Sequence, residues 1–480
     1  MSTIDTLHRD VLIIGAGLSG INVAYRLPQG TTYEIIEARD RIGGTWDLFR
    51  YPGVRSDSDV FTLSYPFRPW TGHNSIVDGA DLRDYIEDTA DHYGISERIT
   101  FNTRAVAANW DSESGQWTVS CEQDGNRVVY TARFLVAASG YYDYDNPHDP
   151  AFAGVEDFTG TILHPQFWPE DISFTGKNVV VIGSGATAMT LVPVLAEKAA
   201  KVTMLQRTPT YVLSQPRVDK LGNVIRSVLP RKLANTVMRS KNSAQQWVLV
   251  ALSARFPSVV KRALNIATIV STRSRTTAHE HFTPPYNPWE QRLCVVPDGD
   301  LFRALRQSRA EVVTAHIDHF VADGIKLVDG GVVPADVIVT ATGLRIKLLG
   351  GVELSIDGRA VDFSERYTWY GTMYSDVPNF AAVIGYINHS WTVRSDLTAK
   401  MIARILRRLR ASQSTSVTPV TPATVGEGRP YMDMQSGYLS RAAAVMPRST
   451  QNYPWSAKQN VLEDTWNTSR ARLDDGLVWS

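Results

Sequence analysis

Short apolar runs followed by glycine-rich turns occur twice along this chain. Val11 to Ile14 form an apolar run that leads into GAGLSG at 15–20, a helical stretch and a second run, YEIIEA at 33–38. The same order returns in NVVVIGSGATA at 178–188 and KVTMLQRT at 201–208. Each series is typical of a strand, a turn, a helix and a strand, which together make a βαβ unit. Two such units, about 168 residues apart, predict two nucleotide-binding sites rather than a short-period repeat.

Three kinds of stretch complete the predicted organisation. The runs RFLVAASG at 133–140 and DVIVTATG at 336–343 end in small residues and glycine, which suits the ligand-binding edge of a parallel sheet. Residues 216–275 have helical periodicity, several basic residues and few β-branched runs, so they predict a helical insertion. Residues 411–424 are rich in Ser, Thr and Pro and predict an exposed loop.

The expected fold class is therefore α/β, with two Rossmann-like dinucleotide-binding domains and a helical insertion. We expect the first part of one domain over residues 1–150 and the second domain over 151–345, with the insertion near 216–290. The chain then returns to the first domain over 346–480. Because Arg and Lys flank the apolar stretches of the insertion, three roles stay open for it: ordinary helix packing, a substrate entrance, or contact with a membrane surface.

The composition excludes several classes of protein. Of the 480 residues, 43% are hydrophobic and 20% are charged, which indicates a folded globular chain rather than a disordered one. Lys plus Arg and Asp plus Glu both number 49, and this balance gives no electrostatic footprint for nucleic acid. Two cysteines are too few for a disulfide framework or a cysteine-rich zinc site. No metal is expected, because the following histidines lack ligand spacing supported by acids or cysteines: His8, His73, His279 and His281.

Two features of the sequence indicate that this is not a membrane protein. The first ten residues, MSTIDTLHRD, contain no apolar segment of the kind that a signal peptide needs. The uncharged segment from Asn242 to Ala254 is too short to cross a bilayer, which takes about 20 helical residues. We expect a soluble, reduced, cytoplasmic protein with membrane contact that is peripheral at most. These patterns do not specify an oligomeric state.

The first glycine-rich turn fits the pattern G-x-G-x-x-G with Gly15, Gly17 and Gly20. The first glycine allows a tight turn, the second lets the backbone approach a pyrophosphate, and the third lets the helix pack closely on the strand. The helix N-terminus then faces the anion. Glu37 ends the next strand, at the spacing of a carboxylate that bonds ribose hydroxyls. This turn therefore predicts a site for an adenine dinucleotide that lacks a 2′-phosphate.

The second turn has the variant pattern G-x-G-x-x-A, and its strand ends in Arg207 and Thr208 rather than in an acid. A carboxylate there would repel a 2′-phosphate, whereas an arginine and a hydroxyl would bind it. The site therefore favours NADP(H) over NAD(H); the other interpretation is that Arg207 only covers the edge of the sheet. The turn itself consists of Gly183, Ser184, Gly185, Ala186, Thr187 and Ala188.

Two dinucleotide sites in one chain indicate one bound cofactor and one that exchanges, most economically FAD reduced by NADPH. A flavin that reduces disulfides needs a close pair of cysteines. Cys121 and Cys294 lie 173 positions apart and form no such motif. The remaining common electron acceptor is molecular oxygen.

Two longer motifs make the identification more specific. One is F-x-G-x-x-x-H-x-x-x-W-P, formed by Phe158, Gly160, His164, Trp168 and Pro169. The other is G-G-x-W-x-x-x-x-Y-P-G-x-x-x-D, formed by Gly43, Gly44, Trp46, Tyr51, Pro52, Gly53 and Asp57. Both resemble the motifs of the type I Baeyer–Villiger monooxygenases, within the class B flavoprotein monooxygenases. The stretches GGTWDLFRYPGVRSDSD, VVIGSGATA, PYNPWEQRLC and GYINHSWT are similar to the ethionamide-activating branch of these enzymes.

This resemblance implies a reaction as well as a fold. Members of the family bind FAD tightly, are reduced by NADPH, and keep NADP⁺ bound while oxygen adds to the flavin C4a. The resulting peroxide attacks a ketone carbonyl, and rearrangement gives an ester or a lactone. The same oxidant can oxidise soft sulfur in sulfides or thioamides. The substrate partners expected here are therefore O2 and a small ketone or sulfide.

The resemblance also implies roles for particular residues. The active-site arginine of the family falls on Arg292, in EQRLC, and its acidic partner falls on Asp57. An arginine suits this task because it stays cationic and can stabilise a peroxyflavin anion and a developing oxyanion. The alternatives are an ordinary salt bridge for Arg292 and a helix cap for Asp57. Further FAD contacts fall on Ser19, Thr45, Trp46, Asp47, Leu48 and Val106, although Trp46 could equally be a core aromatic residue.

Four other positions carry weaker implications. His164 and Trp168 lie where the chain first crosses between the domains, and we expect a hinge role for them rather than proton transfer by the histidine. Trp391, in NHSWT, resembles a residue near the nicotinamide. Gln291 is a departure, because many family members have a lysine there that helps hold the 2′-phosphate.

Three functional hypotheses follow. The first is an NADPH- and O2-dependent FAD monooxygenase that converts ketones to esters or lactones and also oxidises sulfides or thioamides. The second keeps the same reductive half-reaction but makes S- or N-oxygenation the physiological task. The third, from another class, is a flavin-binding redox partner without turnover.

Overall fold

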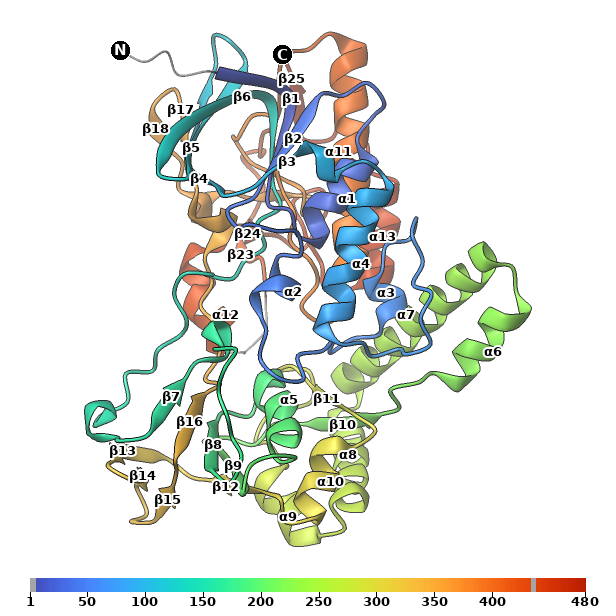
Figure 1. Ribbon diagram of the computed structural model, residues 1–480. Coiled ribbons are helices and arrows are strands. Elements are labelled where there is room, and N and C mark those ends of the chain that lie inside the picture. Colours follow the sequence, from blue (N-terminus) through green and yellow to red (C-terminus); the bar gives the residue numbers. More distant parts are fainter. Residues whose placement is uncertain (1–5, 433–436) are drawn as a thin grey trace.

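The computed structural model describes residues 6–432 and 437–480, which build two sheets, one above the other, with helices around them (Figure 1). Among these residues, nine strands form the upper sheet, in the order β18-β17-β4-β5-β6-β1-β2-β3, with β21 paired to β6. The strands are β1 (Thr6–Ile14), β2 (Tyr33–Ile36), β3 (Ile99–Thr100), β4 (Thr103–Asp111), β5 (Gln116–Gln123), β6 (Asn126–Ala137), β17 (Glu353–Ile356), β18 (Arg359–Ala360) and β21 (Phe380–Ala382).

The upper sheet has a parallel half and an antiparallel half. Strands β3, β2, β1, β6 and β21 are parallel, whereas β4, β5 and β6 form an antiparallel meander. Strands β17, β18 and β21 come from residues 353–382, so the chain returns late to the sheet in which it began.

The lower sheet is entirely parallel, in the order β12-β9-β8-β16-β7. Its strands are β7 (Thr161–Leu163), β8 (Asn178–Ile182), β9 (Lys201–Gln206), β12 (Ala310–Thr314) and β16 (Val337–Thr340). An antiparallel group of β13 (Ile317–Val321), β14 (Gly324–Leu327) and β15 (Val332–Pro334) accompanies it. The expected α/β class with two dinucleotide-type sheets is confirmed.

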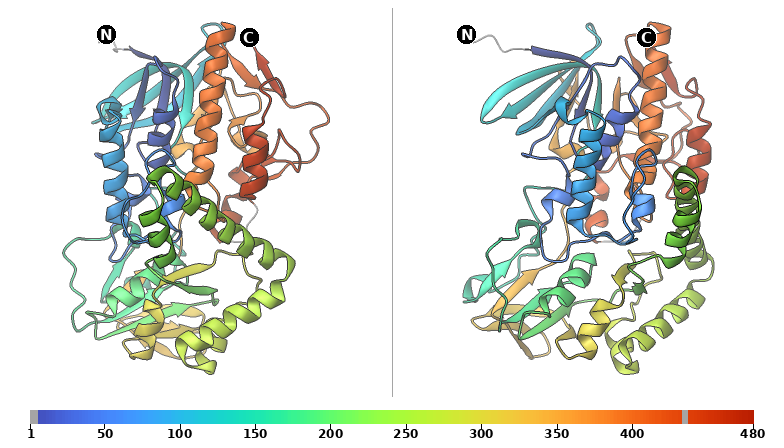
Figure 2. Two further views of the ribbon diagram at one scale, coloured as in Figure 1. Left: turned by 90° about the vertical axis from the view of Figure 1, so that its right-hand side faces the viewer. Right: turned by 45° about the vertical axis from the view of Figure 1, so that its right-hand side comes forward.

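The apolar runs in the sequence are buried on both faces of the sheet. In β1, Val11 and Ile13 pack into one core cluster, while Leu12 and Ile14 pack into another. Successive side chains of a strand point to opposite faces, so a strand covered on both sides must be apolar at every position. On one face the sheet is covered by α1 (Leu18–Arg26), α4 (Gly79–His92) and α11 (Trp391–Ser412), as Figure 2 shows.

The predicted helical insertion is present between β10 (Val212–Gln215) and β11 (Cys294–Pro297). In Figures 1 and 2 it projects from the lower part of the molecule toward one side. None of the helices in the described parts of the chain is long and apolar enough to cross a membrane. The helices of the insertion are α6 (Lys220–Val228), α7 (Arg231–Arg255), α8 (Pro257–Thr272) and α9 (Arg275–His281).

The stretch 411–424 differs from the expected exposed loop. It contains a short strand, β22 (Val417–Pro419), which pairs with β25 (Leu477–Trp479) near the C-terminus. Val417 is fully buried in the core beneath α11. The Ser, Thr and Pro content hid this strand because a single aliphatic side chain, and a partner strand about 60 residues away in sequence, hold it in place.

A buried ion pair links α11 to the last helix of the chain. Asp464, in α13 (Val461–Ser469), lies 3.2 Å from the Nε of Arg394, and both side chains are almost inaccessible to solvent. The Tyr386 hydroxyl donates to the Asp464 Oδ2 at 2.6 Å, and the Tyr453 hydroxyl donates to Oδ1 at 2.8 Å. The Thr468 hydroxyl also donates to Oδ1, at 3.2 Å, so this buried carboxylate has four partners.

We predict that Asp464→Asn lowers the free energy of unfolding by about 3–5 kcal/mol, because it leaves the Arg394 charge buried without compensation. Thermal unfolding followed by circular dichroism measures the change. The matched control is Asp474→Asn, which removes an exposed partner of Arg408 and should leave the unfolding midpoint unchanged. Equal midpoints for Asp464→Asn and the wild type would contradict this assignment.

Candidate active site

A cavity of about 420 Å³ lies where the two sheets meet. Residues from both glycine-rich turns line it, together with side chains from the loop after β2, from the crossing after β6 and from the segment before α11. Ligands of open α/β sheets bind at the carboxyl ends of the strands, and both sheets present those ends here. Of the residues predicted from the sequence, those lining the cavity are Gly15, Gly17, Ser19, Glu37, Thr45, Trp46, Asp57, Ala186, Thr187, Arg292 and Trp391.

The first turn has the geometry that its glycines predict. Gly15 has a φ of +105°, and a Cβ added there would lie 2.8 Å from the carbonyl oxygen of Ala138. A Cβ on Gly20 would lie 1.9 Å from the Gly15 oxygen, so this position keeps helix and strand in close contact without lining the cavity. Gly17 is the N-cap of α1 and offers no side-chain cap, so the N–H groups at the start of the helix can receive an anion.

Glu37 lies at the end of β2 and is 7% exposed. Its Oε2 accepts a hydrogen bond from the Ala16 N–H at 2.7 Å, and its Oε1 accepts one from the Arg39 N–H at 3.0 Å. Burial raises the pKa of Glu37, although these two N–H groups oppose the shift. Each carboxylate oxygen can accept more than one hydrogen bond, so the group can also receive a ribose hydroxyl. The turn and its acid fit an adenine dinucleotide.

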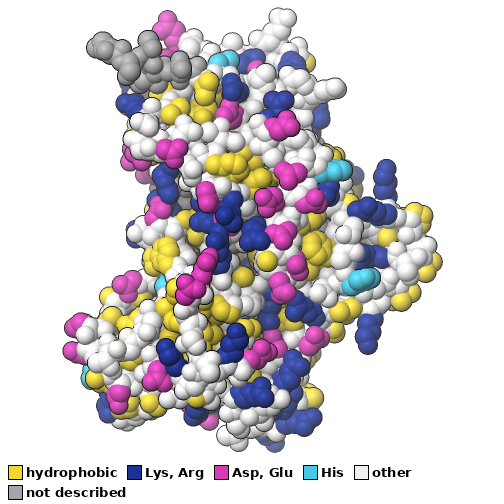
Figure 3. All heavy atoms as spheres, in the orientation of Figure 1, with side chains coloured by type: hydrophobic (Ala, Val, Ile, Leu, Met, Phe, Trp, Pro, Cys, Tyr) yellow, Lys and Arg dark blue, Asp and Glu magenta, His cyan; other side chains and the backbone are white. Residues whose placement is uncertain are grey.

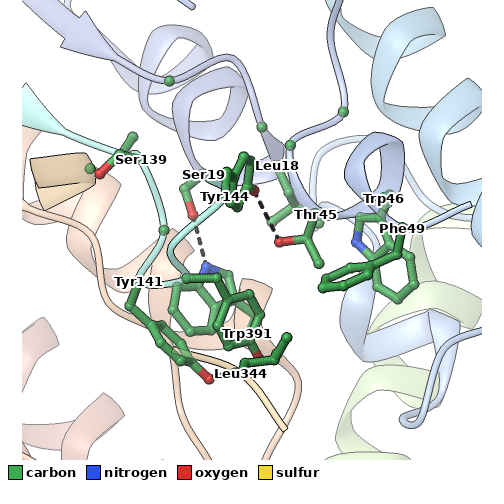
Figure 4. A pocket seen from close by; sticks show the side chains of 18 of the residues that line it. Leu18, Ser19, Thr45, Trp46, Phe49, Ser139, Tyr141, Tyr144, Leu344 and Trp391 are labelled. Carbon is green, nitrogen blue, oxygen red and sulfur yellow. Dashed lines mark hydrogen bonds between the residues drawn. The ribbon is translucent and has the colours of Figure 1, made fainter. Parts of the chain in front are cut away.

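Of the four neighbouring FAD contacts predicted in the loop after β2, two face the cavity and two do not. Thr45 and Trp46, in α2 (Thr45–Leu48), face the cavity, and the Thr45 hydroxyl lies 3.3 Å from the hydroxyl of Tyr144 (Figure 4). Asp47 and Leu48 do not line it. Asp47 is fully buried and pairs with Arg39 and, at 2.8 Å, with Arg50. This carboxylate therefore shapes the loop rather than facing the cavity.

Trp391 lies beside the first turn. Its indole Nε1 donates to the Ser19 hydroxyl at 2.9 Å, and both side chains reach the same end of the cavity (Figure 4). Val106 is outside the lining, next to an irregularity in the pairing of β4 with β5, whereas the preceding Ala105 is part of the lining.

Asp57 and Arg292 meet across the cavity. The Arg292 Nη2 lies 2.8 Å from the Asp57 Oδ2, and Nη1 donates to the Ile387 carbonyl oxygen at 3.4 Å. The side chains are 37% and 34% exposed, so the pair is neither sealed in the core nor free in solvent. Asp57 is not a helix cap, because the cap of α3 (Val60–Leu63) is Asp59, which accepts from the Thr62 N–H. The cavity thus holds a positioned guanidinium.

The second turn repeats the geometry of the first at the start of α5 (Ala186–Leu195). Gly183 has a φ of +135°, and a Cβ there would lie 2.3 Å from the Ala341 oxygen. A Cβ on Gly185 would meet nothing within 4 Å, so an open surface faces this helix N-terminus. Arg207 is exposed beside it. Ala186 and Thr187 reach the cavity, and the other predicted residues lie outside its lining: Gly183, Ser184, Gly185, Ala188, Arg207 and Thr208.

His164 and Trp168 also lie outside the cavity lining. The His164 Nδ1 accepts from the Gln166 N–H at 3.1 Å, while the Gln166 side chain donates to the carbonyl oxygens of Asp143 and Tyr144. Burial, with a smaller contribution from nearby charge, lowers the pKa of His164 to about 4. A ring that is neutral at pH 7 is unsuited to donating protons there, and the contact with the crossing segment is made by the Gln166 side chain rather than by the ring.

Sequence reasoning missed Tyr144, whose hydroxyl contacts Thr45 and whose pKa burial raises to about 12. A signal was available, because GYYDYD follows directly on the RFLVAAS run that was assigned to a ligand-binding edge. Both cysteines are buried and free, and burial raises the pKa of each thiol to about 12. Within the described residues no group of His, Cys, Asp and Glu could hold a metal ion.

Comparison with known proteins agrees with this geometry. Residues 8–256 match the family described as flavin-binding monooxygenase-like. The FAD-containing monooxygenase EthA of Mycobacterium tuberculosis is 44% identical over 474 residues, which cover 98% of this chain and 97% of EthA. The probable FAD-binding monooxygenase AlmA of Acinetobacter baylyi is 43% identical, with 98% and 96% covered.

Two solved structures are similar in fold over the whole chain. A steroid monooxygenase bound to NADP superposes with a TM-score of 0.79 at 22% identity, covering 98% of this chain and 99% of that one. Cyclohexanone monooxygenase with bound ε-caprolactone gives a TM-score of 0.79 at 18% identity, with 99% and 100% covered. The chain therefore belongs to the flavin-binding monooxygenase-like family, and the FAD-dependent monooxygenase predicted from its motifs is confirmed.

Proposed function

We propose that this enzyme uses NADPH and O2 to convert small ketones to esters or lactones, and that it also oxygenates sulfides or thioamides. The observation that carries the proposal is the Asp57–Arg292 ion pair in a cavity that both glycine-rich turns reach. Identity of 44% to EthA along nearly the whole chain supports the monooxygenase chemistry. The resemblance of GYINHSWT and PYNPWEQRLC to the ethionamide-activating branch supports the sulfur oxidation.

Residues on the cavity wall, together with Arg207 and Thr208 outside its lining, fit the two cofactors. The start of α1, the Ser19 hydroxyl and the Glu37 carboxylate would hold FAD, and the start of α5 with Arg207 and Thr208 would hold NADPH. When bound, FAD reduced by NADPH supplies the oxygen-activating chemistry. Gln291 contributes no charge toward the 2′-phosphate, so Arg207 carries that contact.

Arg292 is the proposed catalytic residue. Its guanidinium keeps its protons at any working pH, so it can stabilise negative charge that develops on the substrate oxygen. Asp57 and the Ile387 carbonyl oxygen each engage one of its terminal nitrogens, which restricts the side chain to the cavity wall. Asp57 also offsets the arginine charge when no anionic ligand is near.

We also propose that the chain divides at residues 1–150, 151–345 and 346–480, with the last part returning to the FAD-binding domain, and that the enzyme acts in the cytoplasm. The division rests on β17, β18 and β21 joining the upper sheet, while β7, β8, β9, β12 and β16 form the lower one. Between the two domains, the Gln166 side chain bonds the 164–168 motif to residues 143–144, where the chain leaves the upper sheet.

The function can be tested by product analysis with NADPH recycled and a panel of linear, cyclic and aryl ketones beside an aryl sulfide. We expect esters or lactones together with a sulfoxide. Sulfoxides or N-oxides alone would replace the proposal with S- or N-oxygenation. An enzyme whose flavin band NADPH does not bleach, and which consumes no oxygen, would be a redox partner without turnover.

Replacing Arg292 by Ala should separate the two half-reactions. We expect NADPH to reduce the flavin at a rate near that of the wild type, while ester formation falls about 100-fold or more, because one preorganised donor to the developing charge is lost. Stopped-flow absorbance and product analysis measure the two steps. Arg359→Ala, on the exposed β18, is the matched control. Ester formation near the wild-type rate in Arg292→Ala would refute the role.

Replacing Arg207 by Ala should weaken NADPH selectively. A charge-assisted contact to the 2′-phosphate is available to NADPH and not to NADH, so we expect KM for NADPH to rise about tenfold while KM for NADH stays unchanged. Steady-state kinetics with both nucleotides gives the ratio. An unchanged preference ratio would mean that Arg207 only covers the sheet edge.

A further inference from the structure

The helical insertion exposes an unusual amount of aliphatic surface. On α8, Val259, Ile266 and Val270 are 67%, 53% and 71% exposed. With Ala263, which is also exposed, they occupy positions i, i+4, i+7 and i+11, so they form one continuous stripe along the helix. We refer to these four residues as the α8 stripe. It points away from the molecule, so it is not the surface that holds the helix in place.

The inner face of α8 has the opposite character. It buries Leu264, which packs with Tyr211 and Leu293, and two threonines. The Thr268 hydroxyl donates to the Leu264 carbonyl oxygen at 2.9 Å, and the Thr272 hydroxyl donates to the Thr268 oxygen at 2.8 Å. The polar groups are therefore turned inward and satisfied by the helix itself, while aliphatic groups face out. A helix that meets only water shows the reverse arrangement.

The charge of the insertion is equally one-sided. Residues 220–279 contain eleven Lys and Arg and no Asp or Glu, whereas the whole chain has a formal net charge of zero. Lys241 pairs with Asp219, and Arg226 and Arg239 donate to backbone carbonyls of the neighbouring unit. Arg262, three residues after Val259 and four before Ile266, and Arg273, at the C-cap of α8, are both exposed. Figure 3 shows basic and hydrophobic side chains, without acidic ones, on the projecting arm around α6.

We propose that the outer face of α8 docks on a lipid bilayer that carries anionic headgroups. Aliphatic side chains on one helix face would enter the boundary between headgroups and acyl chains, and the flanking arginines would meet the phosphates. A second copy of this chain would place one cationic surface against another. Nucleic acid would use the charge but would leave the aliphatic stripe in water. Since none of the described helices could cross a bilayer, α8 lies on the surface.

The test is cosedimentation of the FAD-loaded enzyme with large unilamellar vesicles, either pure phosphatidylcholine or phosphatidylcholine with about one third phosphatidylglycerol. We expect the wild type to sediment with the anionic vesicles and to be released by high salt. The triple variant Val259→Ser, Ile266→Ser, Val270→Ser should bind at least about tenfold more weakly, because three buried aliphatic contacts are lost.

Two further variants separate the contributions. Arg262→Gln with Arg273→Gln keeps the aliphatic stripe and should lose binding to the anionic vesicles by about tenfold. Val328→Ser with Val332→Ser removes two valines that are 67% and 49% exposed near β15, away from the insertion, and should bind like the wild type. NADPH oxidation by each variant reports whether it folds. If the triple variant does not fold, the vesicle binding of the arginine variant tests the proposal instead.

Three results would overturn the proposal. The wild type could fail to sediment with either vesicle, it could bind neutral and anionic vesicles equally at all salt concentrations, or the stripe could mediate self-association. The last would appear in analytical ultracentrifugation as an oligomer of the wild type that the triple variant cannot form. None of these results depends on the substrate, so they leave the proposed monooxygenase reaction untouched.

Discussion

The contact between Asp57 and Arg292 is the interaction on which the site depends. The acid comes from the long loop after β2, and the arginine comes from the segment that leads into β11, so the two meet only because both sheets direct the carboxyl ends of their strands toward one cavity. At one-third exposure the pair costs little desolvation, yet it fixes where the guanidinium points. The two glycine-rich turns are then arranged around a charge that is already in position.

Support for that charge extends into the C-terminal part of the chain. Arg292 contacts the carbonyl oxygen of Ile387, and the neighbouring Tyr386 is held by Asp464, which is paired with Arg394 deep in the core. The N–H of Ile387 donates to the side chain of Gln459 at 3.0 Å. Residues near the C-terminus therefore hold in place the Ile387 carbonyl oxygen that Arg292 contacts, in addition to completing the upper sheet.

Local constraints were predictable from the sequence, and long-range ones were not. The positive φ at Gly15 and Gly183 follows from the spacing of the glycines, because each turn is decided within a few residues. Asp47 was expected at the cofactor, yet it is buried under arginines, because membership of a loop does not say which way a side chain points. The bond from Trp391 to Ser19 joins opposite ends of the chain, and no local pattern contains that information.

The equal numbers of acidic and basic residues likewise give the net charge of the chain correctly, but they do not show how the charge is distributed along it. Eleven cations without an anion in residues 220–279 must be compensated elsewhere, so the rest of the chain carries a net charge of −11. The insertion projects to one side of the molecule (Figure 2), so this excess of positive charge is concentrated in one part of it. A net charge of zero therefore does not mean an electrically uniform surface, and the local potential around the insertion is positive.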